Sequence, residues 1–497
     1  MAGLNKNIKN IKRMKDNTKM SKIKKTVFIF ILIFSINFFS LCFLWLNAKF
    51  GSFDLKSLIY HLELIRVGNL LNPDHHLTES FVFYQFKINF ILTFILTMIW
   101  TVFYQISYSS NEKKKSYFKF LCNISELFIK KKIIWIIILL FFLYGLISLI
   151  KNYNFENHTS QSNNYYKLNL NEIKNVKKQN LIIIYTESLD SSFENLNGVN
   201  YLKNLTDFKE KYLSLDKFIQ LKGTGWTAAG IFSSQCGIPL LDGIKDLESD
   251  LTCLPDVLSS IGYKNYFLLG HDINFQNLNL YTNKRYDHVI DYKEIDKYYN
   301  LDSSYKTGWA RSYNDKALFQ LSKKILNNTN SNFFLTILTS DTHGPLGTQQ
   351  QDCYYKYQIR SLEETLECFD SRIVNFLDFI INKHGDDTLI VLMSDHLMMS
   401  GMRFYKDYFD KKNRTMTNIF ISNQFYEKKL ISRDLLNHYD IYPTILNFLE
   451  IYDKTRLRYG VSIFDKNFTN DDAYKNNNKL NKLDKQSNKK IVNVKNF

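Results

Sequence analysis

The sequence lacks several patterns that would assign it to a simpler class of protein. None of its 6 cysteines lies in a C-x-x-C pair, which argues against a zinc knuckle or a thioredoxin-like motif. The chain has no internal repeat, no RNP-type motif and no basic helix. Its net charge of +16 is therefore not taken as a sign of a nucleic-acid partner. The basic residues cluster instead at 6–25, 113–132 and 475–495.

Three long apolar segments account for the first two basic clusters. They span residues 26–46, 88–106 and 133–150, and each approaches the roughly 20 residues that cross a bilayer. The first is longer than a signal-peptide core and has no small-residue cleavage site, so we expect it to remain as an anchor. The positive-inside rule assigns residues 1–25 to the cytoplasm and exports the chain after the third span. We therefore expect a membrane domain of three helices at 26–150.

The remainder divides by composition into a linker at 151–178, a globular domain at 179–465 and a polar tail at 466–497 that is typical of disorder. Four cysteines fall in the globular domain, namely Cys236, Cys253, Cys353 and Cys368. An even number fits two local disulfides in an exported domain, Cys236 with Cys253 and Cys353 with Cys368. Free buried thiols are the alternative.

The globular domain has an α/β pattern. The apolar runs LIIIY at 181–185, FFLTIL at 333–338 and TLIVLM at 388–393 are typical of buried parallel strands. Further strands are expected at 266–269 and 418–421, and helices at 254–261, 314–326 and 362–381. Each of the three apolar runs is followed by a polar motif: TES at 186–188, THGP at 342–345 and SDH at 394–396.

These motifs predict one site, because ligands of open α/β sheets bind beyond the carboxyl ends of the strands. Glu187, His343, Asp395 and His396 would converge there, and GTGWTAAGIFSSQCGIPL at 223–240 adds a threonine hydroxyl between small residues at a helix start. Three oxygens and one nitrogen suit one divalent ion, manganese, zinc or magnesium. Such an ion would lower the pKa of the hydroxyl and polarise a phosphoryl group, and the helix N-terminus would add N–H groups for the phosphate.

With these motifs the chain resembles the membrane-anchored phosphoglycerol and phosphoethanolamine transferases of the alkaline phosphatase/sulfatase superfamily, especially those that modify periplasmic glucans. The likeness rests on the 223–240 block, IYTES, CLPDVLSSIGYKNYFLLG at 253–270, THGP, SDHLMM and HYDIYPTIL at 438–446. It implies an alkaline phosphatase/sulfatase-like central sheet flanked by helices and preceded by the membrane helices. It also implies a metal held by Glu187, a threonine nucleophile, Asp395 and His396.

Two threonines compete for the role of nucleophile. Thr224 begins a T-x-x-T pattern like the T-x-x-S of the family, and it keeps the spacing to the GIP of 237–239 that is seen in lipoteichoic acid synthases. Thr227 follows the bulky Trp226 and could act as a helix cap instead. We therefore expect Thr224 to be the nucleophile and keep Thr227 as the alternative.

The resemblance also assigns the substrate contacts. His343 matches the histidine that binds the transferred phospho-group, and His271, Asp272 and Trp226 are expected at the headgroup. The tryptophan and arginine of lipoteichoic acid synthases are replaced by Phe275, Gln276 and Asn277, which argues against a polymerase. Trp309, Arg311 and Asp315 lie in a segment, GWARSYND, that resembles a family segment near the site and has no assignable role.

The expected activity is metal-dependent transfer of phosphoglycerol from phosphatidylglycerol to a cell-envelope glycan through a phospho-threonine. The enzyme would be a multi-pass protein of a bacterial inner membrane, with its catalytic domain facing the periplasm or the exterior. The alternatives are phosphoethanolamine transfer to lipid A or a surface glycan, a sulfatase-fold phosphodiesterase, and a membrane-tethered binding protein. A histidine that phosphoethanolamine transferases carry after the D-H pair is absent here, and so is the C-x-P-S-R-type context of true sulfatases.

Overall fold

The computed structural model describes two parts of the chain. The described residues are 30–31, 34–35, 37–38, 87–107, 168, 170–174, 179–221, 223–240, 244–299, 301–309, 312–329, 332–344, 346–348, 353, 361–398, 414–422, 431 and 433–469. They belong to two compact units, one that contains the described residues up to 107 and one that contains those from 168 onward. Each unit is described by itself.

The first unit contains helix α4 (Asn89–Ser107), which coincides with the second apolar segment of the sequence. Its polar side chains contact the segment at 30–38. Asn89 donates to the carbonyl of Phe34 at 3.3 Å, and Asn37 donates to Thr93 at 3.4 Å. Within the described residues, no helix combines the length and the apolar character needed to cross a bilayer. The expected segments at 26–46 and 133–150 lie largely or entirely outside the described residues, as do most of the linker and the tail.

The second unit is built on a six-stranded sheet in the order β4-β3-β5-β1-β6-β7. The strands are β1 (Asn180–Thr186), β3 (Lys264–Leu269), β4 (His288–Ile290), β5 (Phe333–Leu338), β6 (Thr388–Ser394) and β7 (Asn418–Ile421). All neighbouring strands are parallel except β7, which runs antiparallel to β6. The sheet is thus mixed. The three apolar runs of the sequence form its centre, because β5, β1 and β6 are adjacent and covered on both faces.

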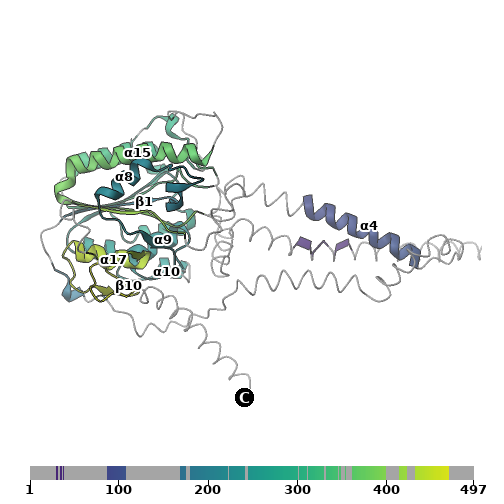
Figure 1. Ribbon diagram of the computed structural model, residues 1–497, viewed down its shortest axis with the longest axis horizontal. Coiled ribbons are helices and arrows are strands. Elements are labelled where there is room, and N and C mark those ends of the chain that lie inside the picture. Colours follow the sequence, from purple (N-terminus) through teal and green to yellow (C-terminus); the bar gives the residue numbers. More distant parts are fainter. Residues whose placement is uncertain are drawn as a thin grey trace, which may run out of the picture. The chain divides into compact units, whose positions relative to one another are not determined.

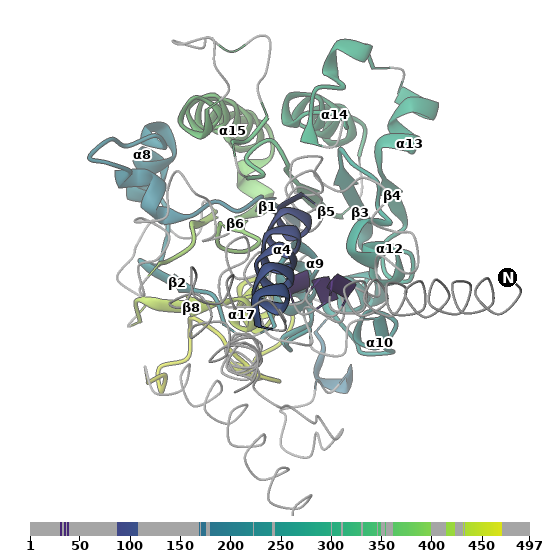
Figure 2. The same ribbon diagram turned by 90° about the vertical axis from the view of Figure 1, so that its right-hand side faces the viewer.

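Helices cover both faces of this sheet (Figures 1 and 2). One face carries α8 (Lys203–Lys211), α14 (Asp315–Asn328) and α15 (Leu362–His384), and the other carries α9 (Thr227–Cys236), α11 (Leu254–Ser260), α12 (Leu278–Thr282) and α17 (His438–Phe448). The side chains of β1 alternate between the two apolar cores: Ile183 and Tyr185 join the core under α9, and Ile182 and Ile184 join the core under α15. The expected α/β architecture is confirmed.

Local sequence signals explain where the helices begin. The side chain of Asn314 accepts from the N–H of Ala317 at the start of α14, and the side chain of Ser361 accepts from the N–H of Glu364 at the start of α15. Asn437 forms a capping box at the start of α17. The helices expected at 254–261, 314–326 and 362–381 appear as α11, α14 and α15.

Smaller elements complete the second unit. They are α10 (Ile244–Leu247), α13 (Tyr292–Glu294), the parallel pair β2 (Lys217–Ile219) and β8 (Leu435–Asn437), and the antiparallel pair β9 (Arg456–Leu457) and β10 (Gly460–Val461).

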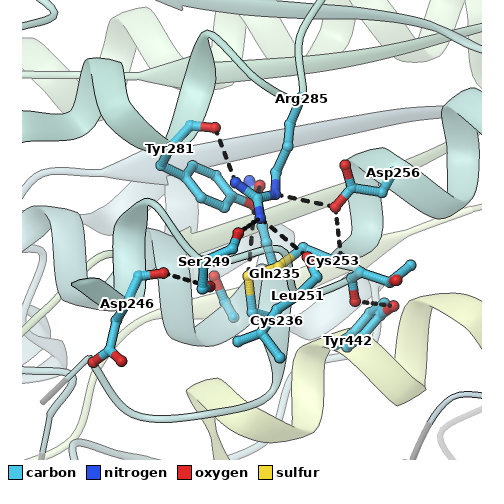
Figure 3. Close-up of a disulfide and its surroundings, with 12 residues drawn as sticks. Gln235, Cys236, Asp246, Ser249, Leu251, Cys253, Asp256, Tyr281, Arg285 and Tyr442 are labelled. Atoms are coloured by element: carbon cyan, nitrogen blue, oxygen red, sulfur yellow. Dashed lines mark hydrogen bonds and ion pairs between the residues drawn. A yellow bond between two sulfur atoms is a disulfide. The ribbon is translucent and has the colours of Figure 1, made fainter. Parts of the chain in front are cut away.

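A disulfide fastens the far end of α9 (Figure 3). It joins Cys236, the last residue of α9, to Cys253, which caps α11. Arg285 lies beside it, donating to the carbonyls of Ser249 and Leu251 and pairing with Asp256 at 3.0 Å. A second disulfide joins Cys353 to Cys368 in α15. Both are the local pairs considered from the sequence, and the first anchors the helix whose other end enters the candidate site.

Candidate active site

Three ionisable side chains meet at the carboxyl ends of two neighbouring strands. Glu187 follows β1, and Asp395 and His396 follow β6; the strands are in register, with Thr186 opposite Ser394. The Nε2 atom of His396 lies 3.6 Å from Oε1 of Glu187 and 3.5 Å from Oδ2 of Asp395. All three residues are buried, and one ligand atom from each lies within 4.8 Å of the others. The structure thus brings together three of the residues singled out as metal ligands.

Two carboxylates lie close together in this buried cluster. Burial, together with the neighbouring charge of Glu187, raises the pKa of Asp395 to about 7. Burial alone would lower the pKa of His396, but the two carboxylates outweigh burial and raise it. The Oδ2 atom of Asp395 is buried and has no hydrogen-bond partner among the described residues. A cation would relieve each of these conditions.

The orientation of His396 also suits a metal ligand. Its Nδ1–H donates to the carbonyl of Leu397 at 2.9 Å, so Nε2 is the nitrogen that faces the carboxylates. Two carboxylate oxygens and one imidazole nitrogen form a mixed donor set that zinc and manganese accept. The described residues therefore fit a divalent ion in three respects: the carboxylate oxygen without a hydrogen-bond partner, the burial of the cluster and the mixed donor set.

Ser188 organises the cluster although sequence reasoning assigned it no role. Its backbone is left-handed, with φ of 52°, a conformation that costs a non-glycine residue about 1–2 kcal/mol. The N–H of Ser188 donates to Oδ1 of Asp395 at 2.8 Å, and its hydroxyl donates to Oε1 of Glu187 at 2.6 Å. The hydroxyl also lies 3.5 Å from Nδ1 of His396. Ser188 therefore contacts all three candidate ligands.

The two candidate threonines differ in their distance from the cluster. Thr227 is the first residue of α9, and its Oγ1 lies 3.4 Å from Nε2 of His396. Thr224 is fully buried, and its Oγ1 donates to the carbonyl of Leu221 at 2.8 Å and accepts from the N–H of Leu221 at 3.2 Å. The hydroxyl of Thr224 thus closes a turn, and the alternative, Thr227, is the threonine that reaches the cluster.

Gly230 explains how α9 comes so close to the end of β6. A Cβ atom at this position would lie 1.9 Å from the carbonyl oxygen of Asp395. Glycine is therefore required by close approach and not by backbone conformation. This glycine of the 223–240 block has a definite function that the sequence alone did not reveal.

The expected phosphate-binding N–H groups of α9 are partly occupied. The N–H of Ala228 donates to Oε1 of Gln276 at 2.9 Å. Gln276 and Asn277 both adopt left-handed backbone conformations, with φ of 52° and 53°. This strained turn after β3 brings the side chain of Gln276 to the start of α9. Gln276 supports the helix that carries Thr227.

The two histidines expected to contact substrate follow two other strands of the sheet. His271 follows β3 and His343 follows β5, and β5 adjoins β1 in the sheet. Burial lowers the pKa of His271 to about 4, with His343 contributing in the same direction. The ring of His343 stacks on Trp309 with 4.5 Å between centroids.

The other two expected contacts have different surroundings. The carboxylate of Asp272 accepts from the N–H and the side chain of Asn274 and pairs with Lys293 at 3.0 Å, so its contacts are within its own loop and with α13. Trp226 precedes Thr227 as the N-terminal cap residue of α9, and its side chain packs against the apolar core on the face of the sheet that α9 covers.

Comparison with known proteins gives the family. Residues 179–451, more than half of the chain, match the Sulfatase family. The chain belongs to this family. Phosphoglycerol transferase I of Salmonella arizonae is 32% identical over 274 residues, which cover 52% of this chain and 35% of the relative. The same protein of Salmonella typhimurium has the same identity and coverage. The match thus spans about a third of these relatives' length.

Among solved structures, the integral membrane protein lipooligosaccharide phosphoethanolamine transferase A (EptA) from Neisseria meningitidis has a similar fold. It is 14% identical, with a TM-score of 0.50, over 87% of this chain and 86% of that chain. At this identity the likeness supports the sulfatase fold alone.

The residues that sequence reasoning missed share a signal. Ser188 and Gly230 lie one and three residues from the expected ligand Glu187 and the alternative nucleophile Thr227, inside motifs that were already singled out. Contacts to the site are short from both positions. The serine directly follows a candidate ligand carboxylate, and the glycine lies on the first turn of the helix that carries the hydroxyl. Trp309 was singled out with the GWARSYND segment, but the sequence assigned it no role.

Proposed function

We propose that this protein transfers phosphoglycerol from phosphatidylglycerol to a glycan of the cell envelope, with Thr227 as the nucleophile. The observation that carries the proposal is the approach of the Thr227 hydroxyl to Nε2 of His396, beside the carboxylates of Glu187 and Asp395. The relatives named phosphoglycerol transferase I support the choice of group transferred. Membership of the Sulfatase family does not determine the substrate, because one fold hosts several chemistries.

A divalent ion held by Glu187, Asp395, His396 and the hydroxyl of Thr227 fits the donor set. When bound, manganese, zinc or magnesium would supply Lewis-acid stabilisation of phosphoryl oxygens and a lower pKa for the hydroxyl. The protein's own contribution is to hold the ligands apart from bulk water and in a fixed geometry, which Ser188 does through its contacts with all three.

The reaction would proceed in two displacements at phosphorus. Oγ1 of Thr227 attacks the phosphorus of the donor, the bond to the lipid oxygen breaks, and diacylglycerol leaves with a proton. A hydroxyl of the acceptor glycan then attacks the same phosphorus, the bond to Oγ1 breaks, and Thr227 recovers its proton. Two displacements divide one difficult transfer into two easier steps.

His343 is the candidate for handling the proton and the phosphate. Its Nδ1–H donates to the carbonyl of Gly344 at 2.9 Å, and we assign contact with substrate to the other ring nitrogen, Nε2. We assign His343 to hydrogen bonding with the phosphoryl group and to protonation of the departing oxygen. His271 would contact the headgroup in its neutral form, because burial lowers its pKa to about 4.

A lipid donor agrees with the surface of α4. Its polar residues Asn89 and Thr93 are fully buried, whereas Phe90 and Ile91 are more than half exposed. This arrangement is the reverse of that of a helix in water, where the apolar face is buried. It supports a membrane location for the first unit. We propose that this membrane is a bacterial inner membrane, with the catalytic domain on its periplasmic or outer side.

The test compares Thr227→Ala with Thr224→Ala on vesicles of phosphatidylglycerol and, separately, of phosphatidylethanolamine. Release of diacylglycerol from phosphatidylglycerol by the wild type, its loss in Thr227→Ala and its retention in a folded Thr224→Ala protein would support the proposal. Turnover of phosphatidylethanolamine alone would indicate a phosphoethanolamine transferase. Release of glycerol phosphate into water, with none on a glycan acceptor, would indicate a phosphodiesterase. Absence of turnover with metal bound would leave a binding protein.

A further inference from the structure

Trp309 contacts two segments that bring side chains to the site, the loop after β3 and the loop after β5. Its ring stacks on His343 with centroids 4.5 Å apart and planes inclined by 29°. It also makes edge contacts with Phe275 at 4.9 Å and with His271 at 5.5 Å. His271 and His343 come from the ends of β3 and β5, which are neighbours in the sheet. One indole thus contacts both histidines that the proposed function uses.

The loop that carries Trp309 is fastened to the end of β3. The N–H of Tyr313 donates to the carbonyl of Gly270 at 3.1 Å, directly before His271. A Cβ atom on Gly270 would lie 2.1 Å from the carbonyl oxygen of Tyr313, so the two backbones are in close contact. Within the loop, the N–H of Ser312 donates to the carbonyl of Trp309 at 3.1 Å. The position of the indole is therefore tied to the strand that presents His271.

Each histidine has a second constraint of its own. The Nδ1–H of His343 donates to the carbonyl of Gly344, and the Nδ1–H of His271 donates to the carbonyl of Asp272 at 3.1 Å. The hydrogen bond at Nδ1 sets the tautomer, but this bond by itself would allow the plane of the ring to rotate about it. A ring face packed against His343 removes that freedom, and an aromatic pair contributes about 0.5–1.5 kcal/mol beyond the area it buries.

We propose that Trp309 is a positioning residue for His343: its indole fixes the plane of the imidazole so that Nε2 meets the phosphoryl group. The proposal rests on the proposed function for the role of His343. Because a displacement of about 1 Å can cost about 100-fold in rate, loss of the stack should lower kcat by about 10- to 100-fold. KM for the donor should change less, because the headgroup keeps its other contacts.

The experiment compares Trp309→Phe with Trp309→Leu in the full-length protein. Phenylalanine can still stack on imidazole, whereas leucine fills space without a ring face. A positioning role predicts that Trp309→Phe retains most of kcat and that Trp309→Leu loses it, with unchanged metal affinity and thermal stability. A space-filling role predicts equal activities, and that result would overturn the proposal. Tyr298→Ala is the matched control, because its side chain is 62% exposed and lies on another segment.

A second readout separates this proposal from the proposed function. Resonances of 13C-labelled His343 in the metal-loaded protein, assigned with His343→Gln, should carry a ring-current shift from the indole. The shift should largely disappear in Trp309→Leu and persist in part in Trp309→Phe. If the wild type turns over no phospholipid but the shift behaves in this way, the proposed function fails and the positioning contact stands. Shifts that are identical in all three proteins would refute the contact itself.

Discussion

Replacement of Gly230 by alanine should disrupt the site through a single methyl group. In the middle of a helix, this change ordinarily stabilises a protein by about 1 kcal/mol. Here the new Cβ atom would lie 1.9 Å from the carbonyl oxygen of Asp395 and 2.8 Å from its carbonyl carbon, whereas real contacts are essentially never below 3.0 Å. Both partners are backbone, so α9 and the end of β6 must separate by about 1 Å. Thr227 moves with α9, and Asp395 and His396 move with β6.

A separation of this size should reduce turnover by about 100-fold or more. Metal affinity should fall as well, because two ligands and the hydroxyl no longer converge. Turnover on phosphatidylglycerol vesicles and titration with zinc or manganese measure the two effects, and circular dichroism reports whether the fold survives. Gly225→Ala is the matched control from the same motif, since its Cβ would meet the side-chain amide of Gln220 at 2.9 Å and no backbone atom within 4 Å. A Gly230→Ala protein that is as active as Gly225→Ala and more stable than the wild type would refute this reasoning.

Three further predictions concern single side chains. Ser188→Ala should weaken metal binding by about 10- to 100-fold while the fold is retained, which isothermal titration calorimetry would detect; unchanged affinity would argue against its supporting role. Burial lowers the pKa of His438 in the folded protein to about 3. The contribution of neutral His438 to stability is therefore complete above its pKa in the unfolded chain, about 6.5, and is lost as the pH falls towards 3. The raised pKa of Asp395 changes stability in the opposite direction over an overlapping pH range, so the metal-free wild type should be compared with metal-free His438→Gln. Between about pH 7 and about pH 5 the free energy of unfolding of the wild type should fall by about 2 kcal/mol relative to that of the variant. Parallel pH profiles of the two proteins would contradict the assignment. Arg433→Leu should cost about 3–5 kcal/mol, because it leaves the buried carboxylate of Asp440 without its partner at 2.5 Å; chemical denaturation would measure the loss, and a change below about 1 kcal/mol would contradict it.

The centre of the fold could be predicted because its signals are local and redundant. The runs that became β1, β5 and β6 are continuously apolar, as strands buried on both faces require. The helices expected to begin at residues 314 and 362 begin at Asp315 and Leu362 in the structure. The antiparallel direction of β7 carried no such signal, since a short apolar run does not reveal the direction in which it pairs.

The sequence points to the candidate ligands by topology, whereas it offers little basis for choosing between the two candidate nucleophiles. Glu187, Asp395 and His396 follow strands, and strand ends converge by topology alone. The choice between Thr224 and Thr227 depended on spacing to a later motif, and spacing does not report where a hydroxyl points. What separates the two in the structure is a three-dimensional fact: Thr224 is fully buried in a turn with Leu221, and Thr227 begins the helix that Gly230 allows to approach Asp395.

The most direct test of the central claim is peptide mass spectrometry of the metal-loaded protein after incubation with phosphatidylglycerol vesicles and no acceptor. We expect a glycerol phosphate adduct on the peptide that contains Thr227, and fragmentation that assigns the adduct to that residue. An adduct on Thr224, or steady release of diacylglycerol with no adduct on either threonine, would contradict this expectation.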